Sequence, residues 1–304
     1  MKVFLTGGHG MVGRNFSARP QALEIHAPRR RDLDLRDKGA VLRYLQALQP
    51  DVIVHAAGRV GGIAANMADP YPFLIENLEI GSNVIDCAIQ AGVPRLLNLG
   101  SSCIYPKNVA GQLHEDMILT GPMEPTNEGY ALAKVAALRL CEFASRQYGV
   151  AYKTIIPCNL YGLFDNFDPL SAHLIPAIIR KVHQAKVEGH NSVEIWGDGS
   201  ARREFMYSGD LAEFLGFAVD NFDALPNLMN VGVGDDHSVL EYYQAVSAVV
   251  GWSGTFRFDP TRPAGMQRKL VSTQRQTTLG WQPCTRLLDG IRLTYDHFLS
   301  EQLA

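Results

Sequence analysis

The first half of the chain alternates short apolar runs with longer amphipathic segments. Apolar runs predict strands at residues 2–6, 23–27, 52–56, 95–99 and 152–157. Amphipathic segments predict helices at residues 11–18, 38–48, 73–91 and 130–148. Strands such as Val52-Ile53-Val54 are apolar at every position, so we expect them to be buried on both faces. Short strands separated by helices predict an α/β fold with a doubly wound parallel sheet.

Beyond about residue 160 the regular alternation of predicted strands and helices ends, and the loops become longer. Helices are predicted at residues 173–187, 211–221, 239–250 and 287–301. We expect a dinucleotide-binding domain over 1–162, with a returning segment near 203–235. A smaller C-terminal α/β domain over 163–304 would bind the substrate. The chain has no internal repeat and no low-complexity linker, so we expect the two domains to share an extensive interface.

Composition and charge narrow the possible partners. The 304 residues are 46% hydrophobic and 19% charged, with a formal net charge of −3. This balance argues against a nucleic-acid partner, because such domains carry a basic excess. No apolar run approaches the ~20 residues of a membrane span, so no membrane partner is expected. The five cysteines include no CxxC pair, which predicts neither a disulfide framework nor a metal site and favours a cytoplasmic protein.

A glycine-rich loop follows the first predicted strand and opens a helix. Gly7, Gly10 and Gly13 have the GxxGxxG spacing, which allows a tight turn and a close approach of backbone to pyrophosphate. The helix N-terminus would then face the phosphates with free N–H groups. The alternative is a tight turn without a ligand. The predicted cofactor-binding residues of this loop are Gly7, Gly8, His9, Gly10, Met11, Val12 and Gly13.

The end of the second predicted strand indicates which dinucleotide binds. Pro28 is followed by three arginines, Arg29–Arg31, where the adenosine ribose is expected. Basic residues there favour the 2′-phosphate of NADP(H), and His9 could add to that pocket. Asp32 and Asp34 could bind adenine or only pair with the arginines. The alternative is a solvated basic turn.

Tyr130 and Lys134 form a YxxxK pair at helical spacing, so the two side chains share one face. A nearby ammonium favours phenolate, and we therefore expect Lys134 to lower the pKa of Tyr130. Ser101 follows the strand at residues 95–99, at an edge where ligands of open parallel sheets bind. Its hydroxyl could hydrogen-bond a substrate oxygen. These three residues predict proton transfer at a substrate oxygen.

The glycine loop, Ser101 and YxxxK together resemble the extended short-chain dehydrogenase/reductase superfamily. Longer strings are similar to its GDP-L-fucose synthase family, from residue 2 to about 300: residues 61–63, 99–107, 124–128, 159–162, 196–197 and 203–205. The resemblance implies a Rossmann-type fold and an NADP(H) enzyme that epimerises C3 and C5 of a GDP-4-keto-6-deoxy-D-mannose-type sugar and reduces C4. Superfamily analogy also implies a homodimer, formed through the helices at 73–91 and 130–148.

The same resemblance implies roles for further residues. Cys103 matches the family's base and His173 its acid in epimerisation, whereas taken alone they read as a small buried hydrophobe and a capping histidine. Lys181, Trp196 and Arg203 match positions that bind the substrate nucleotide. Further cofactor-binding positions are Arg30, Asp34, Leu35, Leu99, Gly100, Ser102, Pro157, Cys158, Asn159 and Leu160.

The chain also departs from the family pattern. His9 and Lys181 stand where the family has arginine, and Ala264 and Ser272 replace carboxylates. Three alternatives therefore stay open. One is a related GDP-sugar enzyme of colitose or heptose metabolism. Another is a single-activity nucleotide-sugar epimerase or dehydratase with tightly held NAD. The third is a dinucleotide sensor without chemistry, although such a protein would not need Ser101, Tyr130 and Lys134 together.

Overall fold

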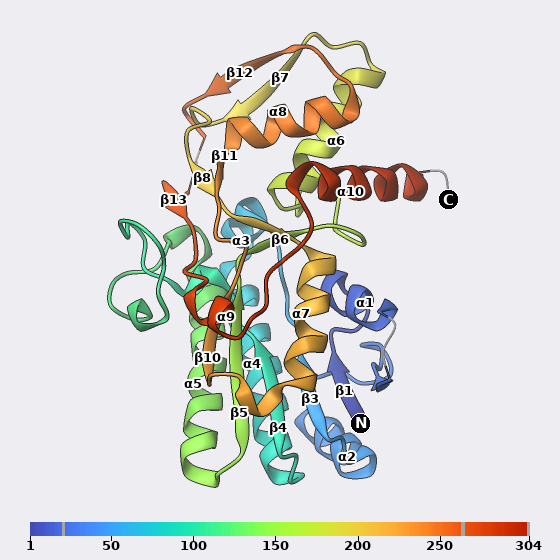
Figure 1. Ribbon diagram of the computed structural model, residues 1–304, viewed down its shortest axis with the longest axis vertical. Helices are drawn as coiled ribbons and strands as arrows, with labels where there is room; N and C mark the ends of the chain where they lie inside the picture. The colour runs from blue at the N-terminus through green and yellow to red at the C-terminus, as the bar shows by residue number, and fades with distance from the viewer. Residues whose placement is uncertain (20–21, 263–264, 303–304) are drawn as a thin grey trace.

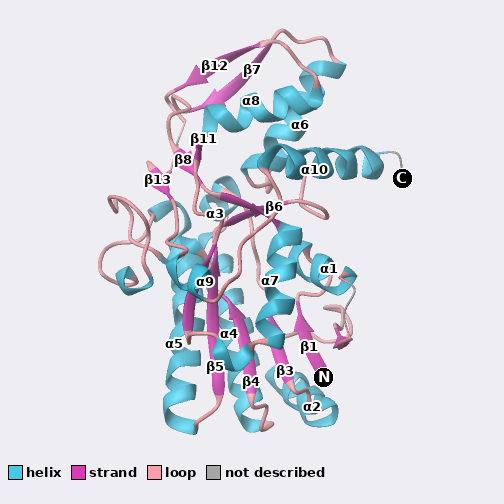
Figure 2. Ribbon diagram, viewed as in Figure 1, coloured by secondary structure: helices cyan, strands magenta, loops and turns pink. Residues whose placement is uncertain are grey.

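A six-stranded parallel sheet forms the larger part of the molecule (Figures 1 and 2). The computed structural model describes residues 1–19, 22–262 and 265–302. The strand order is β10-β5-β4-β3-β1-β2, and every neighbouring pair is parallel. The strands are β1 (Lys2–Thr6), β2 (Glu24–His26), β3 (Val52–His55), β4 (Arg95–Leu99), β5 (Ala151–Pro157) and β10 (Leu228–Val231).

Helices cover both faces of this sheet (Figure 1). On one face α1 packs against α7, and on the other α4 packs against α2 and α5. Their bounds are α1 (Met11–Ala18), α2 (Lys38–Leu48), α4 (Pro70–Gln90), α5 (Glu128–Tyr148) and α7 (Ser208–Asp220). Successive residues of a strand point to opposite faces. Accordingly, Val3 and Leu5 of β1 pack with Phe16, whereas Phe4 packs in the cluster of Leu45 and Ile85.

The predicted doubly wound sheet is confirmed, and most predicted boundaries agree within three residues. Helix α4 begins at Pro70, three residues before the predicted start at residue 73, because proline fits the first position of a helix. Helix α7 likewise begins three residues early, at Ser208. Strand β10 was not predicted as a strand, although it falls inside the expected returning segment. Together with α7, it carries residues of the second half of the chain into the sheet layer.

A smaller part lies beyond the carboxyl ends of the sheet strands (Figure 1). Its core joins α6, α8 and α10 around Ile178, Tyr242 and Phe298. The elements outside the large sheet and its covering helices are α3 (Ile63–Ala68), β6 (Asn159–Tyr161), α6 (Leu174–Val187), β7 (Ser192–Trp196), β8 (Arg202–Arg203), β9 (Phe205–Tyr207), β11 (His237–Ser238), α8 (Val239–Val250), β12 (Thr255–Asp259), β13 (Arg268–Lys269), α9 (Gln274–Thr278) and α10 (Leu287–Gln302).

The buried carboxylate of Glu204, between β8 and β9, ties the two parts together. It accepts backbone N–H groups from Val233 at 2.7 Å and Gly234 at 2.8 Å, just beyond β10. Its other oxygen accepts the N–H of Val271 at 2.9 Å, just beyond β13. Burial raises the pKa of Glu204 to about 7, and these N–H groups oppose the shift. One side chain therefore satisfies three backbone donors from two segments, one beyond β10 and one beyond β13.

We predict that Glu204→Gln destabilises the protein by about 1–3 kcal/mol, because an amide NH₂ would face a backbone donor and leave it unpaired. The measurement is urea unfolding at pH 8, where the carboxylate is ionised. Glu213→Gln is the control, because Glu213 makes a surface ion pair with Arg19 and such pairs contribute about 0–1 kcal/mol. Equal stability of Glu204→Gln and wild type would show that this carboxylate does not hold the junction.

Candidate active site

A cavity of about 550 Å³ lies at the carboxyl ends of β1, β3 and β4. The strand order reverses at β1, where β2 and β3 lie on either side, and open sheets bind ligands at such a point. The predicted site residues that line the cavity are Gly7, Gly8, His9, Gly10, Met11, Val12, Arg30, Asp34, Leu35, Leu99, Gly100, Ser101, Ser102, Cys103, Tyr130, Lys134, Pro157, Cys158, Asn159, Leu160 and His173. Four predicted residues are not among its lining: Gly13, Lys181, Trp196 and Arg203.

The glycine loop leaves its backbone open to a ligand. Gly7 has φ +71°, and a Cβ there would lie 2.8 Å from the backbone of Ala56. A Cβ on Gly13 would lie 2.3 Å from the carbonyl oxygen of Gly7, so Gly13 allows close packing rather than ligand contact. Gly10, the N-cap of α1, has no side chain to occupy the first N–H groups of the helix. The loop therefore fits the pyrophosphate of a dinucleotide.

Of the three clustered arginines, only Arg30 lines the cavity. Its side chain is 68% exposed, and its Nε lies 4.0 Å from the Asp34 carboxylate. Arg31 instead lies 3.7 Å from Asp32. Hydrogen bonds from Arg36 lower the pKa of Asp34 to about 2, so this carboxylate is already engaged. Arg30 is thus available to a phosphate at the rim of the cavity.

The predicted Ser101, Tyr130 and Lys134 meet at the end of β4. The Lys134 ammonium donates to the Leu99 carbonyl oxygen at 2.9 Å and lies 5.8 Å from the centre of the Tyr130 ring. Burial lowers the pKa of Lys134 to about 8. Burial and Cys103 raise the pKa of Tyr130 well above its ordinary value, and a hydrogen bond with Ser101 opposes this. The expectation of a lowered Tyr130 pKa is therefore wrong in this structure, because burial has the largest effect on the phenol and the Lys134 ammonium is directed to the Leu99 carbonyl.

Cys103 lies in an unusual environment for a partly buried thiol. Asn127 Nδ2 and Lys269 Nζ each donate to its sulfur at 3.2 Å. Burial alone would raise the pKa of Cys103, but the charge of Lys269 and hydrogen bonds from Ser101, Lys269 and Asn127 lower it overall. At Cys141, by contrast, burial raises the pKa to about 12. The Cys103 thiol is therefore a stronger acid than an ordinary cysteine, as a nucleophile or base requires.

His173 immediately precedes α6 and lines the cavity. Its side chain makes no capping hydrogen bond, so the interpretation as a capping histidine does not explain its position. Burial and the charge of Lys269 lower the pKa of His173. The segment before it lies close to residues 61–62, because a Cβ on Gly62 would lie 2.6 Å from the Ala172 carbonyl oxygen. This close approach sets His173 at the cavity wall.

The three predicted nucleotide-binding residues lie on α6, β7 and β8 of the smaller part. Lys181 donates to the Glu194 carbonyl oxygen at 2.9 Å. Trp196 is exposed on β7, with the Arg262 guanidinium 5.2 Å from its ring centre. Arg203, on β8, is electrostatically coupled to Cys103 and donates to the Arg202 carbonyl oxygen at 2.7 Å. Only Arg203 is thus coupled to the predicted catalytic residues.

The sequence also singled out Ala264 and Ser272, whereas two residues that contact Cys103 were not predicted. Ala264 lies outside the described residues. Ser272 is buried, and its backbone N–H donates to Leu113 at 2.9 Å. Sequence reasoning assigned no role to Asn127 or Lys269, which contact Cys103. Asn127 lies within the string at residues 124–128 that resembles the family, so that string was a signal without an assigned chemistry.

Residues 1–19, 22–262 and 265–302 contain neither a metal-binding cluster nor a membrane-spanning helix. No three His, Cys, Asp or Glu side chains there are grouped so that they could hold a metal ion. None of the helices in these ranges has the length and apolar character needed to cross a membrane.

Comparison with known proteins agrees with this site. Residues 3–232 match the model of the NAD dependent epimerase/dehydratase family, and the chain belongs to that family. A GDP-L-fucose synthase of Azorhizobium caulinodans is 51% identical over 98% of this chain and 96% of its own length. A GDP-L-colitose synthase of Yersinia pseudotuberculosis is 47% identical over 99% of both chains. The resemblance to GDP-L-fucose synthases predicted from the sequence is thereby confirmed.

The fold comparison points to the same group of enzymes. The structure of a GDP-D-glycero-L-gluco-heptose synthase from Campylobacter jejuni, determined in the presence of NADPH, is similar to this chain. The TM-score is 0.90, with 30% identity and coverage of 98% of both chains. The predicted Rossmann-type fold is therefore confirmed.

We predict that Arg30→Ala weakens NADPH binding about ten- to a hundred-fold and leaves NADH binding unchanged, because it removes one charge-assisted contact to the 2′-phosphate. Dissociation constants for both cofactors provide the measurement. Arg31→Ala is the matched control, because Arg31 is not part of the cavity lining. Equal loss of NADPH affinity in both variants would mean that only the general charge of this turn matters.

Proposed function

We propose that the chain catalyses the NADPH-dependent 3,5-epimerisation and 4-reduction of a GDP-4-keto-6-deoxy-D-mannose-type sugar to GDP-L-fucose. The observation that carries this proposal is that one cavity contains two sets of acid/base groups. Ser101, Tyr130 and Lys134 form one set, and Cys103 and His173 form the other. A simple ketoreductase requires only the first set. The predictions of an enzyme and of NADP(H) as cofactor agree with the relatives and with the structure determined with NADPH.

The cavity fits NADP(H) in shape and charge. The glycine loop and the N-terminus of α1 would hold the pyrophosphate, and Arg30 would hold the 2′-phosphate. The walls made by Leu99–Gly100 and by residues 157–160 would enclose the remaining ring system. When bound, NADPH supplies a hydride for reduction at C4.

Epimerisation requires a base and an acid at the carbons next to the ketone. Their hydrogens are acidic because the ketone delocalises the charge of the enolate. Cys103, held as a thiolate, would remove a proton from carbon. His173 would return a proton to the opposite side. Its lowered pKa makes its imidazolium form a stronger acid once formed, and the negative charge of a nucleotide diphosphate favours that form.

Reduction requires a proton at the sugar oxygen as hydride reaches carbon. The raised pKa of Tyr130 keeps its hydroxyl protonated near pH 7, which suits a proton donor. The hydrogen bond with Ser101 orients that hydroxyl. Lys134, whose ammonium is fixed on the Leu99 carbonyl, would hold the cofactor side of the cavity in place.

The nucleotide of the substrate would extend from the cavity toward the smaller part. Arg203 would pair with the diphosphate, because guanidinium binds such groups bidentately. Trp196 would offer a flat apolar face, and Lys181 a further positive charge. This arrangement remains a proposal for Lys181 and Trp196, which are not part of the cavity lining.

A second candidate uses the same site on a related GDP-sugar. The relative that is 47% identical is named GDP-L-colitose synthase, and a heptose synthase has the same fold. A tightly held NAD and a single activity fit less well, because Arg30 lines the cavity and Cys103 is paired with an ammonium. A sensor without chemistry would need neither acid/base set.

We also propose that two copies associate through α4 and α5. Leu132, Leu140 and Phe143 are exposed on α5 at spacings that put them on one face. An exposed apolar stripe of this kind fits a second copy of the chain.

The cytoplasmic location and the boundary between domains at residue 162 stay predictions from the sequence.

We predict that Tyr130→Phe lowers the rate of NADPH oxidation by about 10²- to 10⁴-fold, because the proton donor is lost. NADPH binding should survive. The absorbance of NADPH in the presence of the GDP-4-keto sugar gives the rate of oxidation, and a binding titration gives the NADPH affinity. Tyr148→Phe, at an exposed position on the same helix, is the control. A near-normal rate in Tyr130→Phe would show that another group supplies the proton.

We predict that Cys103→Ser lowers solvent deuterium incorporation at C3 and C5 by about 10²-fold or more, since a hydroxyl is a far weaker acid than a thiol. Some reduction of the unepimerised ketone should remain and give a different GDP-sugar. Mass and NMR analysis of product formed in deuterated water provides the measurement, with Cys284→Ser, an exposed cysteine, as control. Exchange at the wild-type rate in Cys103→Ser would reduce Cys103 to a packing residue.

A further inference from the structure

The ammonium of Lys269 is buried without a carboxylate partner. Lys269 is 8% exposed, and among residues 1–19, 22–262 and 265–302 no Asp or Glu lies within ion-pair distance of it. Its Nζ lies 3.2 Å from the sulfur of Cys103, 166 residues away in sequence. A buried charge is costly unless an opposite charge or strong acceptors compensate it. The Cys103 thiol, which contacts the ammonium, is a group that can become the opposite charge by losing its proton.

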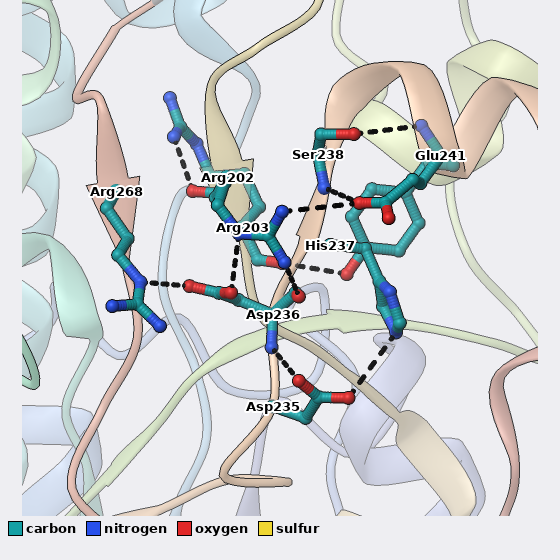
Figure 3. A network of polar contacts seen from close by, with 9 residues as sticks. Arg202, Arg203, Asp235, Asp236, His237, Ser238, Glu241 and Arg268 are labelled. Atoms are coloured by element: carbon teal, nitrogen blue, oxygen red, sulfur yellow. Dashed lines mark hydrogen bonds and ion pairs between the residues drawn. The ribbon is translucent and has the colours of Figure 1, made fainter.

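On strand β13, Lys269 points toward this sulfur, and its neighbour Arg268 anchors the strand on the opposite face. The two residues pair in parallel with Arg202 and Arg203 of β8. Adjacent strand residues point to opposite faces, so Arg268 and Lys269 diverge. Figure 3 shows Arg268 and Arg202 converging on Asp236. Arg202 Nε contacts that carboxylate at 2.7 Å, and Arg268 Nε contacts its other oxygen.

Asp236 thus acts as a clamp between β8 and β13. Its side chain is buried, and the two guanidinium groups satisfy both of its oxygens. Beyond β13, the N–H of Leu113 donates to the Leu270 carbonyl oxygen at 2.8 Å. These contacts fix the strand on both sides of Lys269, and the ammonium has little freedom to leave Cys103.

Most of the other groups around Cys103 also favour the anionic form of its sulfur. Asn127 donates to the sulfur, and a side-chain hydrogen bond with Ser101 also lowers the pKa of the Cys103 thiol. Arg203 adds a positive charge from β8 and is itself coupled to Glu124. Tyr130 of α5 is coupled to the thiol, and an anionic sulfur favours its protonated form. Burial and the charge of Lys269 lower the pKa of His173, which favours its neutral form.

We propose that Lys269 is a positioning residue that holds Cys103 as a thiolate, and that Asp236 and Arg268 fix the strand that presents it. This inference rests on the proposed function in one respect only: the thiolate is the base of the epimerisation. The competing role for Lys269 is binding a phosphate of the GDP-sugar. The two roles differ in the free enzyme, where only the first acts on Cys103.

The test measures the reactivity of Cys103 without any substrate. The rate of alkylation by iodoacetamide is followed from pH 5 to 10 by mass spectrometry of the peptide that contains Cys103. We expect the midpoint of the rate to rise by about one pH unit or more in Lys269→Met, because an opposite charge in contact shifts a pKa by that amount. At neutral pH the alkylation should slow by about ten-fold. An unchanged midpoint would overturn the proposal.

Two further variants separate this role from a general effect on the fold. Lys269→Arg retains the charge and should keep a midpoint close to that of wild type. Lys269→Gln removes the charge with a polar side chain and serves if Lys269→Met does not fold, with the same rise expected. Arg268→Gln releases the clamp and should raise the midpoint by a smaller amount. Thermal unfolding of each variant verifies that the protein is folded, and a raised midpoint in Lys269→Arg would contradict the role of charge.

The kinetic readings distinguish this proposal from the proposed function. Lys269→Met should also lower the rate of deuterium exchange at C3 and C5 by about ten-fold at neutral pH, with NADPH affinity unchanged. A higher KM for the GDP-sugar with an unchanged Cys103 midpoint would assign Lys269 to a phosphate and reject the proposal. A low midpoint in wild type that Lys269→Met loses, without any exchange by wild type, would support the pairing and contradict the epimerase function.

Discussion

All six strands of the large sheet run in the same direction, and the chemistry of this protein depends on that constraint. Parallel strands end at one edge, so the segments that follow β1, β3 and β4 meet there. The glycine loop, Ser101 and Cys103 reach the cavity in this way, and α5 adds Tyr130 from the covering helix. Loops that are far apart in the sequence thus form one site because the parallel strands end at the same edge of the sheet.

In the proposed function, the smaller part supplies the groups that this site needs for its second reaction, the epimerisation. The sheet edge alone supplies the hydroxyl groups and the lysine that a reductase uses. Residues from the second half of the chain, His173 and Lys269, change the charge around Cys103 and supply a partner for it. Glu204 links the backbone segments that follow β10 and β13. In the proposed function, the geometry of epimerisation would therefore depend on how the two parts are joined, whereas the geometry of reduction would be set within the sheet layer.

The elements that could be predicted from the sequence are those whose signal is local. Apolar strands, amphipathic helices, the glycine loop and the YxxxK pair each occupy a continuous stretch, and the structure has them where they were expected. The two-residue strands β8 and β13 are too short for any periodicity, so the contact of Lys269 with Cys103 could not be predicted. The direction of Lys134 was missed because helical spacing gives a shared face but not the acceptor to which a long side chain turns.

The central claim is that one cavity performs both proton exchange at carbon and reduction. The most direct measurement is product analysis of the wild-type protein with GDP-4-keto-6-deoxy-D-mannose and NADPH in deuterated water. This account predicts GDP-L-fucose with deuterium at C3 and C5 and hydrogen from NADPH at C4. Consumption of NADPH to give a GDP-sugar without deuterium at either C3 or C5 would contradict it.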